Sequence, residues 1–357
     1  MRHNKQGFAH LKLRQKVAVD ISQRSIKSSM LGQSWTMPVG IAPTGLAGMQ
    51  WAEGEILGAQ AAEAFGVPFI LSTMSICSIE DVAAATTKPF WFQLYVMKDR
   101  KFIESLIDRA KHAGCSALVL TVDLQILGQR HRDIKNAMTA PPQLTLKNIL
   151  NMMTKPHWCY HMLQTDKREF RNIIGHAQGV EDLSSLGAWS AQQLDPTLNW
   201  ADVAWIKERW NGPLIIKGIM DADDARRAED TGADAIIVSN HGGRQLDGTP
   251  GTVEVLPSIK RAVSDVEVFM DGGITTGQDV FKARALGAQG TFIGKAFLNG
   301  LGAMGKDGVN KCLELIANEL DLTMAFCGYT DINQVDEKVI WKAKRSQKQK
   351  RKEKTNS

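Results

Sequence analysis

A helical pattern that stops at a glycine and is followed by a short apolar strand occurs four times in this chain. The four copies are 64–71, 113–120, 231–238 and 286–293. A glycine that closes a helix just before a buried strand is typical of parallel sheets, because glycine adopts the left-handed conformation that ends a helix at little cost. Four copies argue against chance and predict a fold of alternating helices and strands.

Four more apolar runs bring the expected strands to eight: 38–44, 90–96, 214–219 and 267–272. Amphipathic helical patterns lie between the runs, such as the one after Asp99, which we expect to be an N-cap. Eight such units predict an α/β (β/α)8 TIM barrel, with its active site at the carboxyl ends of the strands. The competing fold, an open doubly wound sheet, needs further strands or a clear Rossmann turn, and the sequence offers neither.

Polar residues follow the expected strands at the ends where a barrel places its active site. The stretch 239–247, which directly follows the run 235–238, combines a base (His241), two glycines and a cation (Arg244). The other ends carry Pro43, Thr44, Gly45, Ser72, Gln93, Tyr95, Thr121, Asp123, Lys217, Asp271, Gly273, Gly294 and Lys295. Each residue alone has an ordinary structural explanation, but eight polar ends on one face of a barrel predict a binding site.

Glycines after the last two strands predict a phosphorylated ligand, because barrels commonly hold phosphate there. Gly294-Lys295 is not a P-loop, since Gln289 and Ala296 break the required pattern. Gly302, Gly305 and Gly308 follow a helical pattern and no strand, so a dinucleotide fingerprint is weakly supported there.

Composition narrows the class of protein. The 357 residues carry a net charge of +5, but residues 342–357 hold eight Lys or Arg and one Glu, a charge of +7, so the remainder carries −2. A near-neutral body does not resemble a nucleic-acid binder, and we expect a basic, disordered tail over 341–357 after one domain at 1–340. Five scattered cysteines without a C-x-x-C pair favour reduced thiols, a cytoplasmic location and no metal site. No apolar run has the length that crosses a bilayer.

Several motifs together resemble the FMN-dependent 2-hydroxy-acid dehydrogenase/oxidase family. These are S-N-H-G-G-R-Q-L-D, F-Q-L-Y, T-V-D, the G-x-R-x-R-D of 128–133, I-I-K-G and D-G-G-I. The resemblance covers residues 2–328 and is closest to the respiratory L-lactate dehydrogenases, which share D-P-x-x-x-W at 195–200. It implies a barrel that binds FMN and oxidises an (S)-2-hydroxy acid.

The resemblance also implies residue roles. His241 takes the proton of the substrate hydroxyl, and Asp123 orients His241 and stabilises its imidazolium form. Arg130 and Arg244 bind the substrate carboxylate, for which the forked guanidinium is suited, and Tyr95 adds a hydroxyl. Lys217 stabilises the reduced flavin. The other residues implied to bind FMN are Pro43, Thr44, Gly45, Ser72, Gln93, Thr121, Ser239, Asp271, Gly273, Gly294 and Lys295.

Three departures from the family pattern stand out. Thr275 follows D-G-G-I where the family usually has arginine, and Lys295 replaces a second arginine, so we expect weaker FMN retention with Thr275 at the phosphate site. The T-V-D motif lacks the proline that normally follows. The chain starts at the family's R-x-N pattern (Arg2-His3-Asn4), so we expect the N-terminal segment, which carries a substrate-binding tyrosine, to be missing.

An insertion at 140–213, between the fourth and fifth strands, takes the place of the family's mobile loop. Its apolar residues, interspersed with Lys147, Lys155 and His157, suggest an interfacial amphipathic segment, so we expect peripheral membrane contact at the cytoplasmic face of the inner membrane. A lid helix packed on the barrel is the alternative interpretation.

We therefore expect oxidation of an (S)-2-hydroxy acid, with L-lactate favoured, to the 2-oxo acid. Electrons pass to a quinone or another acceptor, and the family suggests a homo-oligomer, a tetramer. Three alternatives remain open: an oxidase that uses oxygen on a glycolate-like or mandelate-like substrate, another phosphate-site barrel enzyme such as an isomerase, and a degenerate flavin-binding barrel without catalysis.

Overall fold

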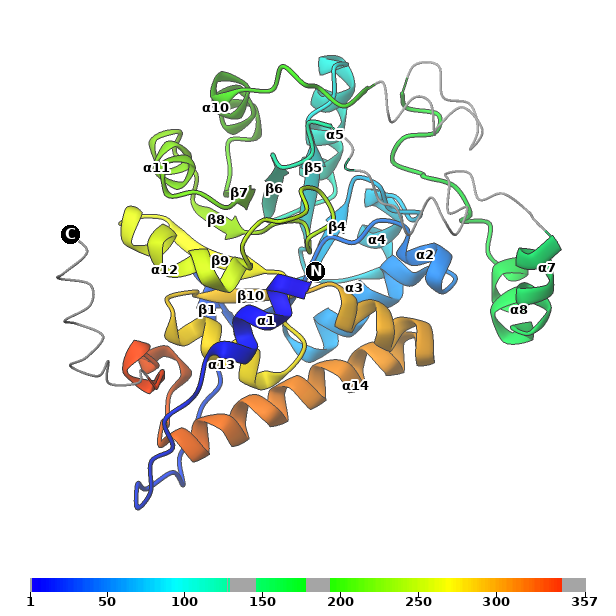
Figure 1. The fold of residues 1–357 in the computed structure, drawn as a ribbon. Coiled ribbons are helices and arrows are strands. Elements are labelled where there is room, and N and C mark those ends of the chain that lie inside the picture. Colours follow the sequence, from blue (N-terminus) through cyan, green and yellow to red (C-terminus); the bar gives the residue numbers. More distant parts are fainter. Residues whose placement is uncertain (1, 127, 129–145, 178–192, 342–357) are drawn as a thin grey trace.

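The computed structural model describes residues 2–126, 128, 146–177 and 193–341. Its central element is an eight-stranded parallel sheet in the order β3-β10-β9-β8-β7-β6-β5-β4 (Figure 1). The strands are β3 (Val39–Ile41), β4 (Ile70–Ser72), β5 (Trp91–Tyr95), β6 (Ala117–Thr121), β7 (Leu214–Ile219), β8 (Ala235–Val238), β9 (Glu267–Asp271) and β10 (Gly290–Ile293).

The sheet closes into a barrel between its first and last strands. Ile41 pairs in parallel with Phe69, and its N–H donates to Pro68 O at 2.9 Å. All eight strands coincide with the expected runs, so the predicted (β/α)8 barrel is confirmed.

Helices surround the barrel (Figure 1). They are α1 (Arg2–His10), α2 (Ala47–Gln50), α3 (Gly54–Phe65), α4 (Ile79–Ala85), α5 (Arg100–His112), α7 (Leu146–Met153), α8 (Pro156–Gln164), α10 (Trp200–Trp210), α11 (Ala222–Asp230), α12 (Thr252–Ala262), α13 (Gly277–Ala285) and α14 (Lys295–Cys327), with 3-10 turns η1 (Ile332–Gln334) and η2 (Glu337–Val339). Asp99 caps α5 as expected, because its side chain accepts a hydrogen bond from Phe102 N at 3.1 Å.

The barrel interior is filled with large apolar side chains. Trp91, Phe269 and Phe292 contact one another there, with ring centroids 5.8 to 6.3 Å apart. Met30 joins this cluster from an antiparallel hairpin, β1 (Ser28–Met30) and β2 (Gln33–Trp35), which the sequence did not suggest. The hairpin lies at the amino ends of the strands, where Leu31 N donates to the Glu267 carboxylate at 3.1 Å. It seals the end of the barrel opposite the expected site.

The glycines Gly305 and Gly308 of α14 allow close packing against neighbouring atoms. The helix breaks at Met304 and Gly305, and a Cβ on Gly305 would lie 3.0 Å from the Trp51 ring. A side chain on Gly308 would collide with the Gly300 carbonyl. Close approach of backbone therefore explains these glycines without a dinucleotide.

The described part of the insertion places α7 against α8 at the side of the barrel (Figure 1). Trp158 in α8 donates to Met49 O at 3.1 Å, which fastens the helix to the end of α2. Among the described residues, no helix combines the length and the apolar content needed to cross a bilayer. All five cysteines are free thiols.

Candidate active site

The carboxyl ends of the strands bring His241 and Asp123 together. His241 Nδ1 lies 3.1 Å from Asp123 Oδ1, although the residues are 118 positions apart. His241 follows β8 in a left-handed conformation with φ of 55°, and Asp123 follows β6. Because Nδ1 faces the carboxylate, Nε2 is the ring nitrogen left to exchange a proton. This is the geometry of a base held by an orienting acid.

The charge of Asp123 follows from its surroundings. Burial favours the neutral carboxyl, but the hydrogen bond from His241 and the positive charge of Lys217 outweigh it and lower the pKa of Asp123 below its usual value. Asp123 is therefore an anion at neutral pH, and it stabilises a positive charge that develops on the imidazole.

A buried network crosses three neighbouring strands beneath this pair. Lys217 Nζ on β7 donates to Ser239 Oγ at 2.7 Å and lies 3.0 Å from Asp271 Oδ2 at the end of β9. Burial alone would lower the pKa of Lys217, but Asp271 and Asp123 raise it above its usual value. The barrel mouth thus holds a permanent ammonium ion.

Several buried polar atoms at the barrel mouth have no partner within the described chain. They are Gln93 Nε2, Thr121 Oγ1, Asp271 Oδ1 and Asp123 Oδ2. The Gln93 amide is held by Ser72 Oγ at 3.1 Å and Thr73 N at 3.3 Å, both at Oε1, so Nε2 is directed elsewhere. Buried donors and acceptors left without partners are costly, and a ligand with carbonyl, imide and hydroxyl groups would satisfy them. FMN has such groups in its ring and its ribityl chain, so these residues fit it.

The expected phosphate side is built from two turns and a helix start. Gly273, after β9, has φ of 93°, and a Cβ there would lie 2.8 Å from Asn4 O. After β10, Gly294 directly precedes α14, whose first residue is Lys295. The free N–H groups at a helix start favour an anion. Thr275 is exposed, and its hydroxyl donates to Asp279 Oδ2 at 3.1 Å, so it helps to cap α13.

Of the expected substrate residues, Tyr95 contacts His241 and Arg244 follows it in sequence. The Tyr95 ring stacks on the His241 ring with centroids 6.5 Å apart and an interplanar angle of 28°. Arg244 is exposed three positions after His241. Arg130 lies outside the described residues.

The turn after β3 completes the rim. Pro43, Thr44 and Gly45 follow this strand, and the Thr44 hydroxyl donates to Ala42 O at 3.1 Å. A Cβ built on Gly294 would be 4.0 Å from Thr44 Oγ1, so the loops after the first and last barrel strands meet.

Two asparagines to which the sequence assigned no role support the turn that carries His241. Asn240 directly precedes His241, and its side chain pairs with that of Asn4, which is buried in α1. The R-x-N pattern and the S-N-H motif contained both residues, but only the fold brings them into contact.

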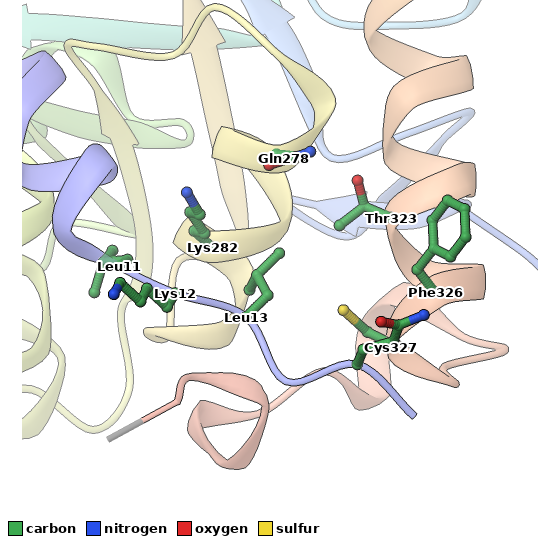
Figure 2. A pocket seen from close by; sticks show the side chains of 9 residues that line it. Leu11, Lys12, Leu13, Gln278, Lys282, Thr323, Phe326 and Cys327 are labelled. Carbon is green, nitrogen blue, oxygen red and sulfur yellow. The ribbon is translucent and has the colours of Figure 1, made fainter. Parts of the chain in front are cut away.

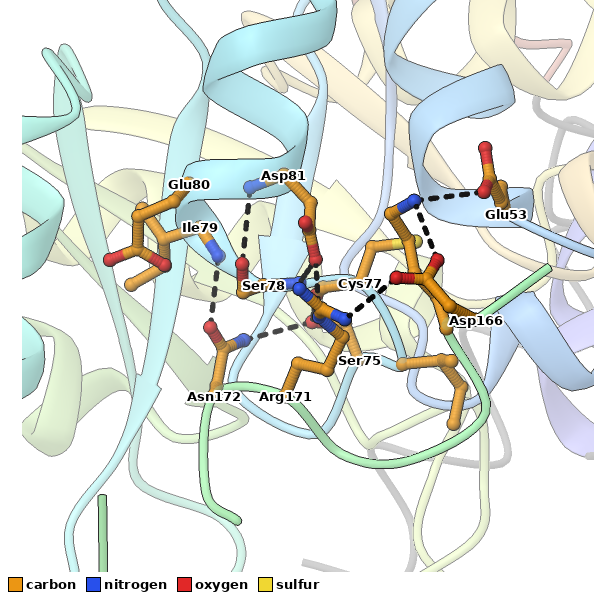
Figure 3. Close-up of polar contacts among 12 residues, drawn as sticks. Glu53, Ser75, Cys77, Ser78, Ile79, Glu80, Asp81, Asp166, Arg171 and Asn172 are labelled. Carbon is orange, nitrogen blue, oxygen red and sulfur yellow. Dashed lines mark hydrogen bonds and ion pairs between the residues drawn. The ribbon is translucent and has the colours of Figure 1, made fainter. Parts of the chain in front are cut away.

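A third asparagine, Asn172, fastens the insertion to the loop after β4 (Figure 3). Its Nδ2 donates to Ser75 Oγ and its Oδ1 accepts from Ile79 N, both at 2.9 Å. Arg171 beside it forms an ion pair with Asp81 at 2.9 Å. No sequence signal marked these residues, because the insertion has no strand or helix period around them.

A separate pocket of about 520 Å³ lies outside the barrel mouth, between the segment after α1 and helices α13 and α14 (Figure 2). Lys282 and Phe326 are among its lining residues, and none of the expected site residues is. The candidate site is the group of polar residues at the carboxyl ends of the strands, and this pocket is separate from it. Among the described residues, no group of three or more His, Cys, Asp or Glu side chains is arranged to hold a metal ion.

Comparison with known proteins gives one family match, described as FMN-dependent dehydrogenase, over residues 1–342. The chain is 41% identical to an L-lactate dehydrogenase of Caulobacter sp. (strain K31), covering 96% of this chain and 90% of the relative. It is 42% identical to an L-lactate dehydrogenase of Vibrio cholerae serotype O1 (strain M66-2), covering 93% and 88%.

Solved structures agree with these matches. A crystal structure of the monotopic membrane protein (S)-mandelate dehydrogenase has a TM-score of 0.90 and 36% identity, covering 95% of this chain and 90% of the other. The flavin-binding domain of baker's yeast flavocytochrome b2 has a TM-score of 0.78 and 28% identity, covering 95% and 78%.

Proposed function

The chain belongs to the FMN-dependent dehydrogenase family and is a 2-hydroxy-acid dehydrogenase of the L-lactate dehydrogenase kind, and we propose that L-lactate is its substrate. The observation that carries this proposal is the identity of 41–42% to relatives named L-lactate dehydrogenase over more than nine-tenths of the chain. The contact between His241 and Asp123 supports the chemistry.

Bound FMN supplies the acceptor for the two electrons and the α-hydrogen that the hydroxy acid loses. The chain's own part is to remove the hydroxyl proton. In this proposal His241 Nε2 takes that proton, and the ionised Asp123 stabilises the resulting imidazolium across the 3.1 Å contact at Nδ1.

The substrate carboxylate is held by Arg244 and Arg130 in this proposal. Arg244 lies in the same turn as His241, so the turn presents a base and a cation together. A forked guanidinium can bind both carboxylate oxygens and orient the α-carbon. The Tyr95 ring, stacked on His241, supports a role for its hydroxyl at the substrate.

The flavin residues follow from the same strand ends. The flavin ring would be held by Gln93 Nε2 and Thr121 Oγ1, together with Ser72, Ser239 and the 43–45 turn. Asp271 Oδ1 would accept hydrogen bonds from the ribityl hydroxyls. The ammonium of Lys217 would stabilise negative charge on the reduced ring. The phosphate would be surrounded by Gly273, Thr275, Gly294 and Lys295.

We propose that the enzyme contacts the cytoplasmic face of the inner membrane and passes electrons to a quinone. Exposed apolar side chains gather on α7 and α8, where Leu150, Met153 and Leu163 are 64%, 71% and 75% exposed. Lys155 and Arg168 are exposed nearby in sequence, as suits an anionic lipid surface. A structural relative is named a monotopic membrane protein.

We also propose a homo-oligomer, with a tetramer as the expected state. Leu315, Leu322 and Phe326 on α14 are more than half exposed, and an interface between copies would cover them. Light scattering of the purified holoenzyme measures the state, and a monomer at micromolar concentration would contradict this expectation.

Steady-state turnover tests the substrate and the acceptor. L-lactate, D-lactate, glycolate and (S)-mandelate are compared with a short-chain quinone or with oxygen as acceptor. We expect L-lactate with quinone to give the highest kcat/KM and D-lactate to give none. Preference for (S)-mandelate or glycolate would overturn the proposed substrate, oxygen as the better acceptor would identify an oxidase, and no turnover by flavin-loaded protein would favour a degenerate barrel.

A further inference from the structure

The turn that presents His241 has an unusual backbone. His241, Gly242 and Gly243 all adopt the left-handed conformation, with φ of 55°, 66° and 71°. Glycine tolerates this conformation, but for histidine it is unfavourable, because its Cβ crowds the backbone. Such a conformation persists only where surrounding contacts enforce it. The turn therefore depends on what holds it.

Asn240 holds the turn from its first position. Its Oδ1 accepts from Gly243 N at 3.0 Å, and its Nδ2 donates to Pro250 O at 3.3 Å. The backbone oxygen of Asn240 also accepts from Gly243 N, at 2.8 Å. A rotation of the Asn240 amide would break the contact of Oδ1 with Gly243 and would leave the Gly243 N–H bonded to the backbone oxygen of Asn240 alone.

The Asn240 amide is in turn fixed by Asn4 of α1. Asn4 Nδ2 donates to Asn240 Oδ1 at 2.8 Å, and Asn240 Nδ2 donates to Asn4 Oδ1 at 2.7 Å. Both side chains are buried, so water cannot replace a lost partner at low cost. These two bonds join positions 236 residues apart and fix the orientation of both amides.

Asn4 also reaches the flavin-phosphate side of the site. Its Oδ1 accepts from Thr252 N at 3.3 Å, and Thr252 Oγ1 donates to Gly272 O at 3.0 Å. A Cβ on Gly272 would be 2.8 Å from Asn4 Nδ2, so the side chain fits closely against the turn after β9. The Asn4 amide therefore contacts both Asn240, which holds the 241–243 turn, and Thr252, which bonds the turn after β9.

We infer that Asn4 is a positioning residue for the reaction, because it locks the Asn240 amide and thereby holds the 241–243 turn that directs His241 at the substrate. This inference rests on the proposed role of His241. Asn4 touches neither substrate nor reacting atoms; it acts through Asn240.

The test compares flavin-loaded Asn4→Ala and Asn4→Asp with wild type and with Lys5→Ala, an exposed residue of the same helix. Asn4→Asp keeps the size but loses the N–H that bonds Asn240 and sets two oxygens against each other. Flavin reduction by L-lactate is followed anaerobically and expressed per bound flavin. We expect both Asn4 variants to be slower by roughly 10- to 100-fold, since small misplacement of a reacting group has this effect, and Lys5→Ala to match wild type.

Hydrogen exchange gives a readout that needs no turnover. We expect the peptide covering 239–248 to exchange faster in both Asn4 variants and at the wild-type rate in Lys5→Ala. If Asn4→Ala does not hold flavin, Asn4→Ser takes its place, because serine keeps a polar group at this buried position but lacks the amide that pairs with Asn240.

Bleaching of wild-type flavin by L-lactate tests the proposed function separately. A wild-type enzyme that bleaches while both Asn4 variants reduce flavin at its rate, with unchanged exchange at 239–248, would overturn the inference alone. Lower thermal stability with an unchanged rate per flavin would also overturn it, because Asn4 would then be merely structural.

Discussion

His241 combines a left-handed backbone, a carboxylate at Nδ1 and a tyrosine ring alongside. Each feature limits the movement of the imidazole, so the direction of its Nε2 is set before a ligand binds. Preorganisation of this kind is what a general base requires, because proton transfer depends on hydrogen-bond distance and alignment.

Replacement of this base should slow the chemical step while FMN stays bound. We predict that His241→Asn lowers the rate of anaerobic flavin reduction by roughly 10²- to 10⁴-fold, the usual contribution of general base catalysis. His112→Asn, at an exposed histidine of α5, is the control and should behave as wild type. A rate within threefold of wild type in His241→Asn would show that another group takes the proton.

The phosphate end makes a second residue-scale prediction. Thr275 offers a hydroxyl already bonded to Asp279, where the family usually has arginine. We predict that Thr275→Arg tightens FMN binding at least about tenfold, because a hydrogen bond to a charged group contributes roughly 1.5–3 kcal/mol. Ser258→Arg, on the exposed face of α12, adds the same charge elsewhere and should leave the Kd unchanged. Equal Kd values for Thr275→Arg and wild type would place the phosphate away from residue 275.

At the scale of elements, the strands were predictable and the additions to the barrel were not. Every strand is an apolar run, and four of the eight follow a helix-closing glycine; burial on both faces leaves no polar alternation along them. The hairpin 28–35 is short and contains three serines and one glutamine, so no apolar run marks it. Its role is clear only from Met30, which packs into the interior of the barrel. Helix α1 was likewise not predicted from the sequence.

Some residues of the candidate site were likewise predictable from the sequence, and others were not. Motifs marked His241, Asp123 and Lys217, because their residue types carry chemistry. Asn4 and Asn172 escaped notice, because an amide becomes informative only when its partners are known, and those partners lie 236 and 97 positions away. Arg130 remains a sequence-based prediction outside the described residues.

The ion pair between α4 and α5 should make stability depend on acid pH. A hydrogen bond from Arg109, at 2.7 Å, lowers the pKa of Glu80 to about 2. Because this value lies below the ordinary pKa of about 4.3, the stabilisation is complete above pH 4.3 and is lost as the pH falls toward 2. Glu80 is half exposed, so the contribution is about 1 kcal/mol or less.

We therefore predict that Glu80→Gln is less stable than wild type at pH 7 and that this difference shrinks at pH 3. Urea unfolding at both pH values measures it, and Glu208→Gln, at an exposed position of α10, is the control. A difference that stays constant with pH would argue against an ionised Glu80 as its source.

The helix pair α7–α8 gives a prediction for membrane binding. We predict that Leu150→Ser, Met153→Ser and Leu163→Ser together weaken binding to anionic lipid vesicles at least tenfold in a sedimentation assay. The reason is that full burial of each of these apolar side chains contributes at most about 1.5–3 kcal/mol to the binding free energy. Val17→Ser with Val19→Ser, exposed in the segment after α1, is the control. Undiminished sedimentation of the triple variant would favour a lid helix over an interfacial segment.

The whole molecule divides its work between the two ends of one barrel. The amino ends are closed by Met30 and the aromatic cluster, which supply rigidity. The carboxyl ends carry His241, the buried ammonium of Lys217 and the polar atoms that have no partner among the described residues, all attached to that rigid floor. Loops from distant parts of the sequence can therefore form one site with small positional error.

The most direct test of this account is anaerobic mixing of the flavin-loaded enzyme with L-lactate while the oxidised flavin absorbance is recorded. We predict complete bleaching in one exponential phase with one pyruvate formed per flavin, and no bleaching with D-lactate. Flavin that stays oxidised in the presence of saturating L-lactate, glycolate and (S)-mandelate would contradict the account at its centre, because a base, a cation and an electron acceptor would then share one site without oxidising a hydroxy acid.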